Sequence, residues 1–292
     1  MLCPLVEETL LKPSNRGLPL LPIHQLLVTL RYYATGNFQL VSGDLLGISQ
    51  PTISRIIKRV SETIASNLRQ YVRFPEDSHG NMLKFYTYRQ FPNVSSCIDG
   101  THIPIKNPGG NIGEVFRNRK RIFSINVQVA CGPNLEIMDI VARYPGSMHD
   151  NTIFARSVLR IRYENRKIPG VILGDNGYGN TQFLFTPVLN PRTRAEENYN
   201  RAHKGTRNII ERCFGVWKGR FLCLREGLTT NLQTSVTIIC ATAVLHNIAL
   251  LENEDFEEDP EVDPINDILI ENDAGNGVAH RNAFILTHFG NN

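Results

Sequence analysis

The sequence lacks the paired cysteines of a zinc ribbon or a disulfide framework. Its six cysteines stand far apart, and no two of them form a CxxC pair. Such spacing is typical of reduced intracellular thiols. We find no apolar run of the ~18–20 residues that cross a bilayer, because the best candidate, CATAVLHNIALL, contains His246 and Asn247. The first residues, MLCPLVEETLL, carry acids where a secretory signal carries bases, so we expect no export.

Basic residues are almost absent from the C-terminal end. Residues 251–292 contain eleven acids and a single base, Arg281, for a net charge of −10, whereas residues 1–250 carry +13. Hydrophobic residues make up 41% of the chain, which excludes wholesale disorder. A basic body favours a nucleic-acid partner, because clustered Lys and Arg attract phosphate whatever the base sequence. The alternative is an enzyme with an unrelated solvated tail.

Composition divides the 292 residues into five segments. Breaker residues indicate a linker at 74–93, which contains Pro75, Gly80 and Pro92. The predicted segments are an N-terminal piece at 1–21, a helical region at 22–73, this linker, an α/β region at 94–250, and an acidic, largely disordered tail at 251–292.

Residues 47–64 have the pattern of a helix-turn-helix recognition helix. Gly47 allows a tight turn, Ser49 can cap the helix, and Pro51 suits its first turn. Five apolar residues at helical spacing share one face: Ile53, Ile56, Ile57, Val60 and Ile64. The outward residues are the candidate DNA contacts: Gln50, Thr52, Arg55, Lys58 and Arg59. The preceding helix is expected at roughly Gln39–Leu46, and an ordinary amphipathic helix with a solvated basic face is the alternative.

Strand-like and helix-like runs alternate from residue 94 to 250. Four strands are expected, at VSSCIDGTHIPI, FSINVQVACG, LEIMDIVARYPG and GVILGDNGYG. The second and third are joined by Gly132, Pro133 and Asn134, which predicts a hairpin. Helices are expected at HDNTIFARSVLRIRYEN, TRNIIERCFGVWKGRF and SVTIICATAVLHNIALL. This order predicts a mixed α/β layer fold.

Four acids occupy places from which they can meet at one edge of this sheet. Asp99 lies within the first strand, Asp150 begins a helix as its candidate cap, Asp175 ends the fourth strand, and Glu211 lies in an apolar helix. A buried acid is costly unless it is paired or binds a metal, and oxygen ligands suit Mg²⁺ or Mn²⁺. Two such ions could activate a water and stabilise the leaving oxygen of a phosphodiester. Taken singly, each acid could be only a cap, a turn residue or an ion-pair partner.

These residues resemble those of the PIF/Harbinger transposases and the Harbinger transposase-derived nucleases of animals. The matching strings, in the family's order, are CIDGTHIPI, PGSMHDNTIF, GDNGYG followed by FTP, and AHKGTRNIIERCFGVWKGRFLCL ending in VLHN. The resemblance implies an RNase H-like DDE nuclease domain at 94–250, a mixed sheet flanked by helices, preceded by an all-α helix-turn-helix region. Asp99, Asp175 and Glu211 would be catalytic, and Asp150 would join them as a ligand of Mg²⁺ or Mn²⁺.

The resemblance also implies a partner and a location. The substrate would be DNA, cut by metal-dependent hydrolysis in the nucleus, with the cytoplasm as a second location. Basic residues near Glu211 would contact that DNA: Arg207, Arg212 and Lys218. Full transposases go on to strand transfer, and a separate Myb/SANT-like protein assists them. Self-association is left open, and no membrane partner is expected.

Two rival functions remain open at this point. The first is a domesticated DNA-binding or interaction protein that no longer cuts, against which stands the presence of all four acids. The second is a metal-dependent phosphohydrolase acting on small molecules. It leaves the recognition-helix pattern and the +13 body unexplained.

Overall fold

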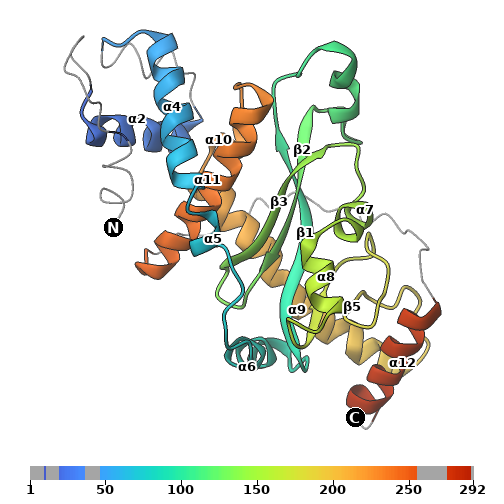
Figure 1. Cartoon of the computed structure of the whole chain (residues 1–292). Helices are drawn as coiled ribbons and strands as arrows, with labels where there is room; N and C mark the ends of the chain where they lie inside the picture. Colours follow the sequence, from blue (N-terminus) through green and yellow to red (C-terminus); the bar gives the residue numbers. More distant parts are fainter. Residues whose placement is uncertain (1–9, 11–19, 37–46, 255–274, 291–292) are drawn as a thin grey trace.

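The computed structural model describes residues 10, 20–36, 47–254 and 275–290 (Figure 1). Its centre is a five-stranded sheet in the order β3-β2-β1-β4-β5. The strands are β1 (Val94–Pro104), β2 (Ser124–Cys131), β3 (Ile137–Pro145), β4 (Val171–Leu173) and β5 (Leu184–Phe185). The pairs β1–β2 and β2–β3 are antiparallel, whereas β1–β4 and β4–β5 are parallel. The predicted mixed sheet and its hairpin are therefore confirmed, and β5 is an unpredicted addition.

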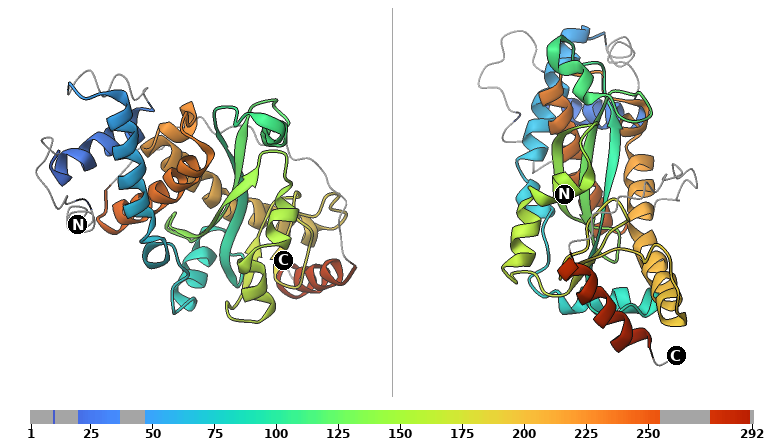
Figure 2. Two further views of the ribbon diagram at one scale, coloured as in Figure 1. Left: turned by 45° about the horizontal axis from the view of Figure 1, so that its top comes forward. Right: turned by 90° about the vertical axis from the view of Figure 1, so that its right-hand side faces the viewer.

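Helices cover both faces of the sheet, as the two views of Figure 2 show. One face carries α7 (Asp150–Ala155) and α8 (Val158–Glu164), and the other carries α9 (Arg194–Arg220). Because successive side chains of a strand point to opposite faces, Ala130 of β2 packs with the α7–α8 layer while its neighbour Val129 packs with the α9 layer. Thr193 and Glu196 form a capping box that begins α9.

A second group of helices lies beside the sheet, where α11 packs against β3 (Figure 1). It contains α2 (Pro22–Thr35), α4 (Gln50–Ala65), α5 (Leu68–Tyr71), α10 (Cys223–Glu226) and α11 (Leu232–Leu251). The predicted apolar face of α4 is confirmed, since all five of its residues are buried, and the helix packs against α2 and α11. Ser49 precedes α4 as expected, but its hydroxyl contacts the Thr52 hydroxyl at 3.0 Å and caps no backbone amide. The expected helix Gln39–Leu46 lies outside the described residues, so the helix-turn-helix stays a prediction.

Helix α11 corrects the expectation about apolar runs. Its 20 residues are long and apolar enough to cross a membrane by length and composition. However, 67% of its apolar window is buried inside the fold, where α11 packs against α4 and β3. It acts here as a core helix. Its polar Asn247 also supports β3, because the Asn247 side chain accepts from the Ile137 amide at 2.9 Å and donates to the Ile137 carbonyl at 2.7 Å.

Two segments expected to be irregular contain helices instead. The expected linker contains α6 (His79–Arg89), which packs against β1 and α9 and buries Phe85 completely. Gly80 is part of this helix and does not break it. The expected disordered tail contains α12 (Gly275–Phe289), which packs on α9 through the buried Ile285 and Phe289. The tail prediction failed for α12 because its apolar residues follow the acidic run. A short 3-10 helix, η1 (Gly110–Phe116), completes the described elements.

Candidate active site

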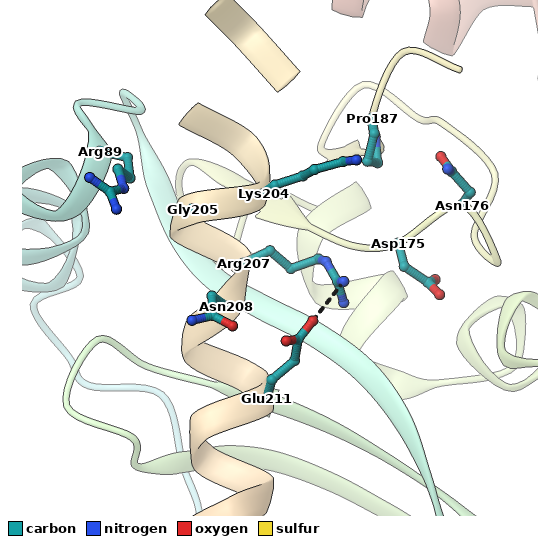
Figure 3. A pocket seen from close by; sticks show the side chains of 9 residues that line it. All are labelled: Arg89, Asp175, Asn176, Pro187, Lys204, Gly205, Arg207, Asn208 and Glu211. Atoms are coloured by element: carbon teal, nitrogen blue, oxygen red, sulfur yellow. Dashed lines mark hydrogen bonds and ion pairs between the residues drawn. The ribbon is translucent and has the colours of Figure 1, made fainter. Parts of the chain in front are cut away.

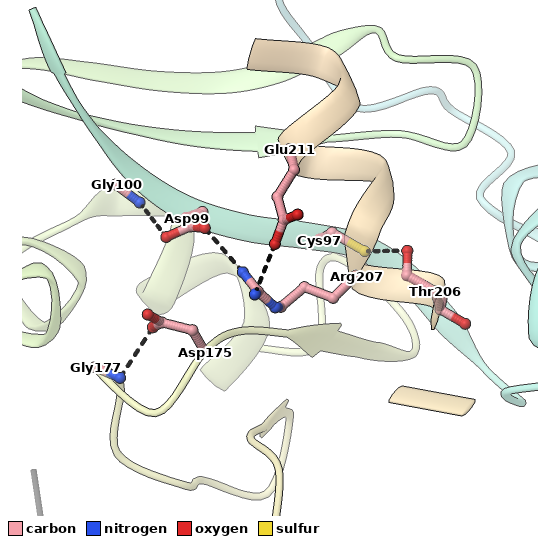
Figure 4. Close-up of polar contacts among 8 residues, drawn as sticks. All are labelled: Cys97, Asp99, Gly100, Asp175, Gly177, Thr206, Arg207 and Glu211. Carbon is pink, nitrogen blue, oxygen red and sulfur yellow. Dashed lines mark hydrogen bonds and ion pairs between the residues drawn. The ribbon is translucent and has the colours of Figure 1, made fainter. Parts of the chain in front are cut away.

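The four predicted carboxylates come from four different elements. Asp99 lies in the middle of β1 and is only 3% exposed, and Asp175 follows the neighbouring strand β4 and is 9% exposed. Asp150 is the first residue of α7, and Glu211 lies in the middle of α9. Figure 4 shows Asp99, Asp175 and Glu211 around the side chain of Arg207.

Arg207 bridges two of these carboxylates. Its Nη1 atom donates to Asp99 Oδ2 and its Nη2 atom donates to Glu211 Oε1, each at 2.9 Å (Figure 4). The bridge joins strand β1 to helix α9. We expected Arg207 to contact DNA, and in this conformation it contacts the predicted catalytic acids. The four-residue step from Arg207 to Glu211 on a helix was the signal that could have predicted their ion pair.

The aspartates are close enough to disturb one another's ionisation. The pKa of Asp99 is raised well above its ordinary value, first by burial, then by the negative charge of Asp175 and, less strongly, that of Asp150. Arg207 and the Gly100 amide, which donates to Asp99 Oδ1 at 2.8 Å, act in the opposite direction. A cluster of mutually repelling buried carboxylates is a place where a cation is stabilised.

Asp150 is held by side chains rather than by the start of its own helix. The N-cap of α7 is His149, so the prediction that Asp150 caps this helix was wrong. Instead, Asp150 Oδ1 accepts from Asn126 Nδ2 of β2 at 2.8 Å. A Cβ atom at Gly100 would lie 2.2 Å from the same oxygen, so only glycine leaves room for this carboxylate beside Asp99.

A tight turn holds Asp175. The Gly177 amide donates to Asp175 Oδ1 at 2.9 Å, and the Asn151 side chain accepts from the Gly179 amide at 3.1 Å. The buried Tyr178 hydroxyl has no hydrogen-bond partner among the described residues, and the pKa of Tyr178 is raised, first by burial and then by Asp150, Asp99 and Asp175. This orphaned hydroxyl therefore lies within the field of the carboxylates.

A cleft of about 400 Å³ opens beside the acids (Figure 3). Two of its basic residues are Lys204 on α9 and Arg89, which ends α6. Arg89 was missed by sequence reasoning because its segment was expected to be a linker. It can lie against α9 because position 205 is glycine, where a Cβ atom would come 2.6 Å from Arg89 Cγ. The complete lining is Arg89, Asp175, Asn176, Pro187, Lys204, Gly205, Arg207, Asn208 and Glu211.

A second group of bases surrounds His102. Lys218 Nζ donates to the His102 carbonyl at 3.3 Å, and Arg119 Nη2 lies 2.8 Å from His149 Nδ1. Burial lowers the pKa of His102, with Asp150 acting in the opposite direction and the bases Lys218, Lys120 and Arg119 lowering it further. His102 and His149, the two histidines close in sequence to Asp99 and Asp150, therefore each contact one of these bases.

The predicted DNA contacts fall in two separate places. Arg207, Arg212 and Lys218 lie on α9 with Glu211. The contacts expected on α4 lie apart from the carboxylates, because α10 and α11 stand between α4 and the sheet (Figure 1). Of these, Gln50, Arg55 and Lys58 are exposed and Thr52 is half-buried. Arg59 is also half-buried and donates to the Gln25 side chain of α2.

The donors suit a hard divalent cation, but their present arrangement is closed. All four predicted ligands are carboxylates, and the orphaned Tyr178 oxygen lies near them. Within the part of the chain that the structure describes, however, no group of three or more His, Cys, Asp and Glu side chains is placed to hold a metal ion. The Arg207 guanidinium, which lies between Asp99 and Glu211, is the physical reason we see for this.

Comparisons with known proteins give a consistent result. Residues 98–247 match the family described as DDE superfamily endonuclease. The chain is 33% identical over 268 residues to "Putative nuclease HARBI1" of Homo sapiens, covering 89% of this chain and 76% of the relative. It is 35% identical to the Mus musculus protein of that name with the same coverage, and 23% identical to "Protein ALP1-like" of Arabidopsis thaliana, covering 89% and 70%. No solved structure matches.

Proposed function

This chain belongs to the DDE superfamily endonuclease family, and we propose that it is a Harbinger-type nuclease that hydrolyses phosphodiester bonds of DNA. The observation that carries the proposal is the convergence of Asp99, Asp150 and Asp175, which lie near enough to raise the pKa of Asp99, while Arg207 joins Asp99 to Glu211. The strand order β3-β2-β1-β4-β5 with helices on both faces supports an RNase H-like core.

Asp99, Asp150, Asp175 and Glu211 would hold Mg²⁺ or Mn²⁺. When bound, two such ions supply an activated water and charge stabilisation for the leaving 3′ oxygen. Asp99 is suited to a shared position because it lies on the central strand, between β2 and β4. The Asn126 amide orients Asp150, and the Gly177 amide orients Asp175.

The surrounding bases would hold the substrate backbone. Arg89 and Lys204 line the cleft on one side of the acids, and Lys218 and Arg119 lie on the other, near His102. Bases on both sides of an acidic centre can guide a polyanion toward it despite the negative carboxylates. The presence of two separate groups of bases favours a nucleic acid over a small phosphate ester as substrate.

The remaining expectations are part of the same proposal. Helix α4, with its exposed Arg55 and Lys58, would contribute to DNA recognition as the second helix of a helix-turn-helix. The chain would act in the nucleus, with the cytoplasm as a second location, and a Myb/SANT-like partner would assist it. Strand transfer after cleavage and self-association also remain proposals.

A catalytically retired DNA-binding protein is the second candidate. It is favoured by one observation: Arg207 occupies the space between Asp99 and Glu211. Incubating the chain with DNA that carries Harbinger-type terminal repeats and Mn²⁺, then mapping the new ends, distinguishes the two. Defined 3′-hydroxyl ends that disappear with EDTA support the nuclease, whereas binding without cleavage supports the retired form.

A further inference from the structure

We propose that Arg207 is a built-in stand-in for the divalent cation. In the metal-free chain it neutralises Asp99 and Glu211, and it gives up both carboxylates when the cation binds. This inference rests on the proposed function, because it takes the two carboxylates as cation ligands.

The geometry makes Arg207 and a cation direct competitors. The Gly100 amide donates to Asp99 Oδ1 at 2.8 Å, and Arg207 Nη1 donates to Asp99 Oδ2 at 2.9 Å. The other arm of the guanidinium reaches Glu211 Oε1 at the same distance. The Arg207 and Asp99 side chains are only 11% and 4% exposed, so water screens this pair weakly. A cation that bridges these two oxygens would take the position that the guanidinium now holds.

Electrostatics gives the exchange its direction. Without a cation, the buried carboxylate of Asp99 is repelled by the carboxylates of Asp175 and Asp150. The guanidinium of Arg207, which contacts Asp99, supplies a positive charge that offsets this repulsion. A buried carboxylate that loses its charged partner strongly destabilises the fold. This cost accounts for the presence of Arg207 among the predicted catalytic acids. Once a doubly charged ion lies among the carboxylates, it compensates them more fully and repels the guanidinium.

The structure also offers a destination for the displaced side chain. Arg207 lines the 400 Å³ cleft together with Lys204 and Arg89, and Figure 3 shows its side chain reaching across that cleft from α9. A guanidinium released there would lie among other bases, in a place where its planar fork can pair with phosphate oxygens. Arg207 would then neutralise Asp99 and Glu211 in the metal-free chain and contact the DNA backbone once the cation is bound.

Direct Mn²⁺ binding tests the exchange without measuring activity. Isothermal calorimetry at pH 7.5 would compare the unmodified full chain, Arg207→Gln, and the control Arg201→Gln. Arg201 lies on the same helix, is exposed, and contacts Asn198 at 3.3 Å rather than an acid. We expect Arg207→Gln to bind Mn²⁺ at least fivefold more tightly than the other two chains. Its metal-free Tm should be lower than theirs, and saturating Mn²⁺ should raise that Tm by a larger amount.

Equal or weaker Mn²⁺ binding by Arg207→Gln would overturn the stand-in role while leaving the nuclease proposal standing. No binding by any of the three chains would overturn the proposed metal site itself, and the inference with it. Should Arg207→Gln fail to fold, the unmodified chain gives a second measurement. In a ¹⁵N spectrum of arginine side chains, saturating Mg²⁺ should make the Arg207 Nε–H exchange with water markedly faster. An unchanged signal in the presence of bound Mg²⁺ would contradict the exchange.

Discussion

The carboxylate of Asp150 lies in the space that a side chain at Gly100 would occupy. A Cβ atom there would come within 2.2 Å of Asp150 Oδ1 and 2.7 Å of its Cγ. The two residues belong to different elements, α7 and β1, and Gly100 directly follows Asp99. Because Gly100 has no side chain, the Asp150 carboxylate can lie beside Asp99, and two of the predicted ligands are therefore close together.

The substitution Gly100→Ala tests this relationship. We expect nicking to fall at least 100-fold, and stability to fall by about 1–3 kcal/mol because of overpacking. In an Asp150→Ala background the same substitution should cost much less, since the clashing group is gone. Gly80→Ala is the matched control, because, in the described part of the chain, a Cβ atom at that helical position would meet nothing within 4 Å apart from its own helix backbone and chain neighbours. Additive stability costs for Gly100→Ala and Asp150→Ala in urea unfolding would contradict the close approach.

Helix α12 should stabilise the segment that directly follows β5. Arg281 is 7% exposed, and its Nη1 atom donates to the Thr186 carbonyl at 3.4 Å and the Pro187 carbonyl at 3.2 Å. We expect Arg281→Ala to lower the free energy of unfolding by about 1–3 kcal/mol, because the buried Pro187 carbonyl loses this donor, whereas the Thr186 carbonyl keeps the Tyr199 hydroxyl at 2.9 Å. Leu286→Ala, at a position 72% exposed on the same helix, should change it by less than about 0.5 kcal/mol. Equal effects in urea unfolding would mean that α12 contributes nothing through Arg281.

The buried His203 should make the fold sensitive to acid. Burial lowers its pKa to about 3, although its Nε2 atom lies 2.9 Å from the Phe185 carbonyl. Below the ordinary pKa of about 6.5 the unfolded chain takes up a proton that the folded chain refuses, so stability falls as pH drops from about 6.5 toward 3. This one group should account for about 3 kcal/mol between pH 7 and pH 4, at about 1.4 kcal/mol per unit.

Urea unfolding across that pH range measures the effect. His203→Gln should flatten the acid side of the stability curve, whereas His24→Gln, on the exposed face of α2, should leave its slope unchanged. Parallel curves for His203→Gln and the unmodified chain would show that His203 is not the acid-sensitive group.

Sequence reasoning succeeded where local pattern and tertiary structure agree. The alternating and β-branched runs predicted β1 to β4, and the apolar face of α4 was predicted residue by residue. It missed β5, Leu184–Phe185, because two residues carry no readable period and the strand exists only through pairing with β4. It also missed α12, whose apolar residues follow an acidic run that dominated the composition of the tail.

The candidate site shows the same division. The strand and helix positions of Asp99, Asp175 and Glu211 followed from the sequence, since each lies in or beside a predicted element. The close approach of Asp150 to Gly100 did not, because it joins residues 50 positions apart across two elements. The position of Arg207 depended on a contact 108 residues away in sequence, with Asp99. Such distant pairings are set by the packed fold rather than by local spacing.

The central claim is that the four carboxylates support metal-dependent DNA cleavage. Its most direct test is a Mn²⁺-dependent nicking assay of the unmodified chain, Asp175→Asn, and the control Asp77→Asn. Asp77 is exposed and accepts from the His79 amide, far in sequence from the predicted ligands. The account predicts nicking by the unmodified chain and Asp77→Asn, and none by Asp175→Asn, which should still bind DNA with nearly unchanged affinity. Undiminished nicking by Asp175→Asn would contradict it.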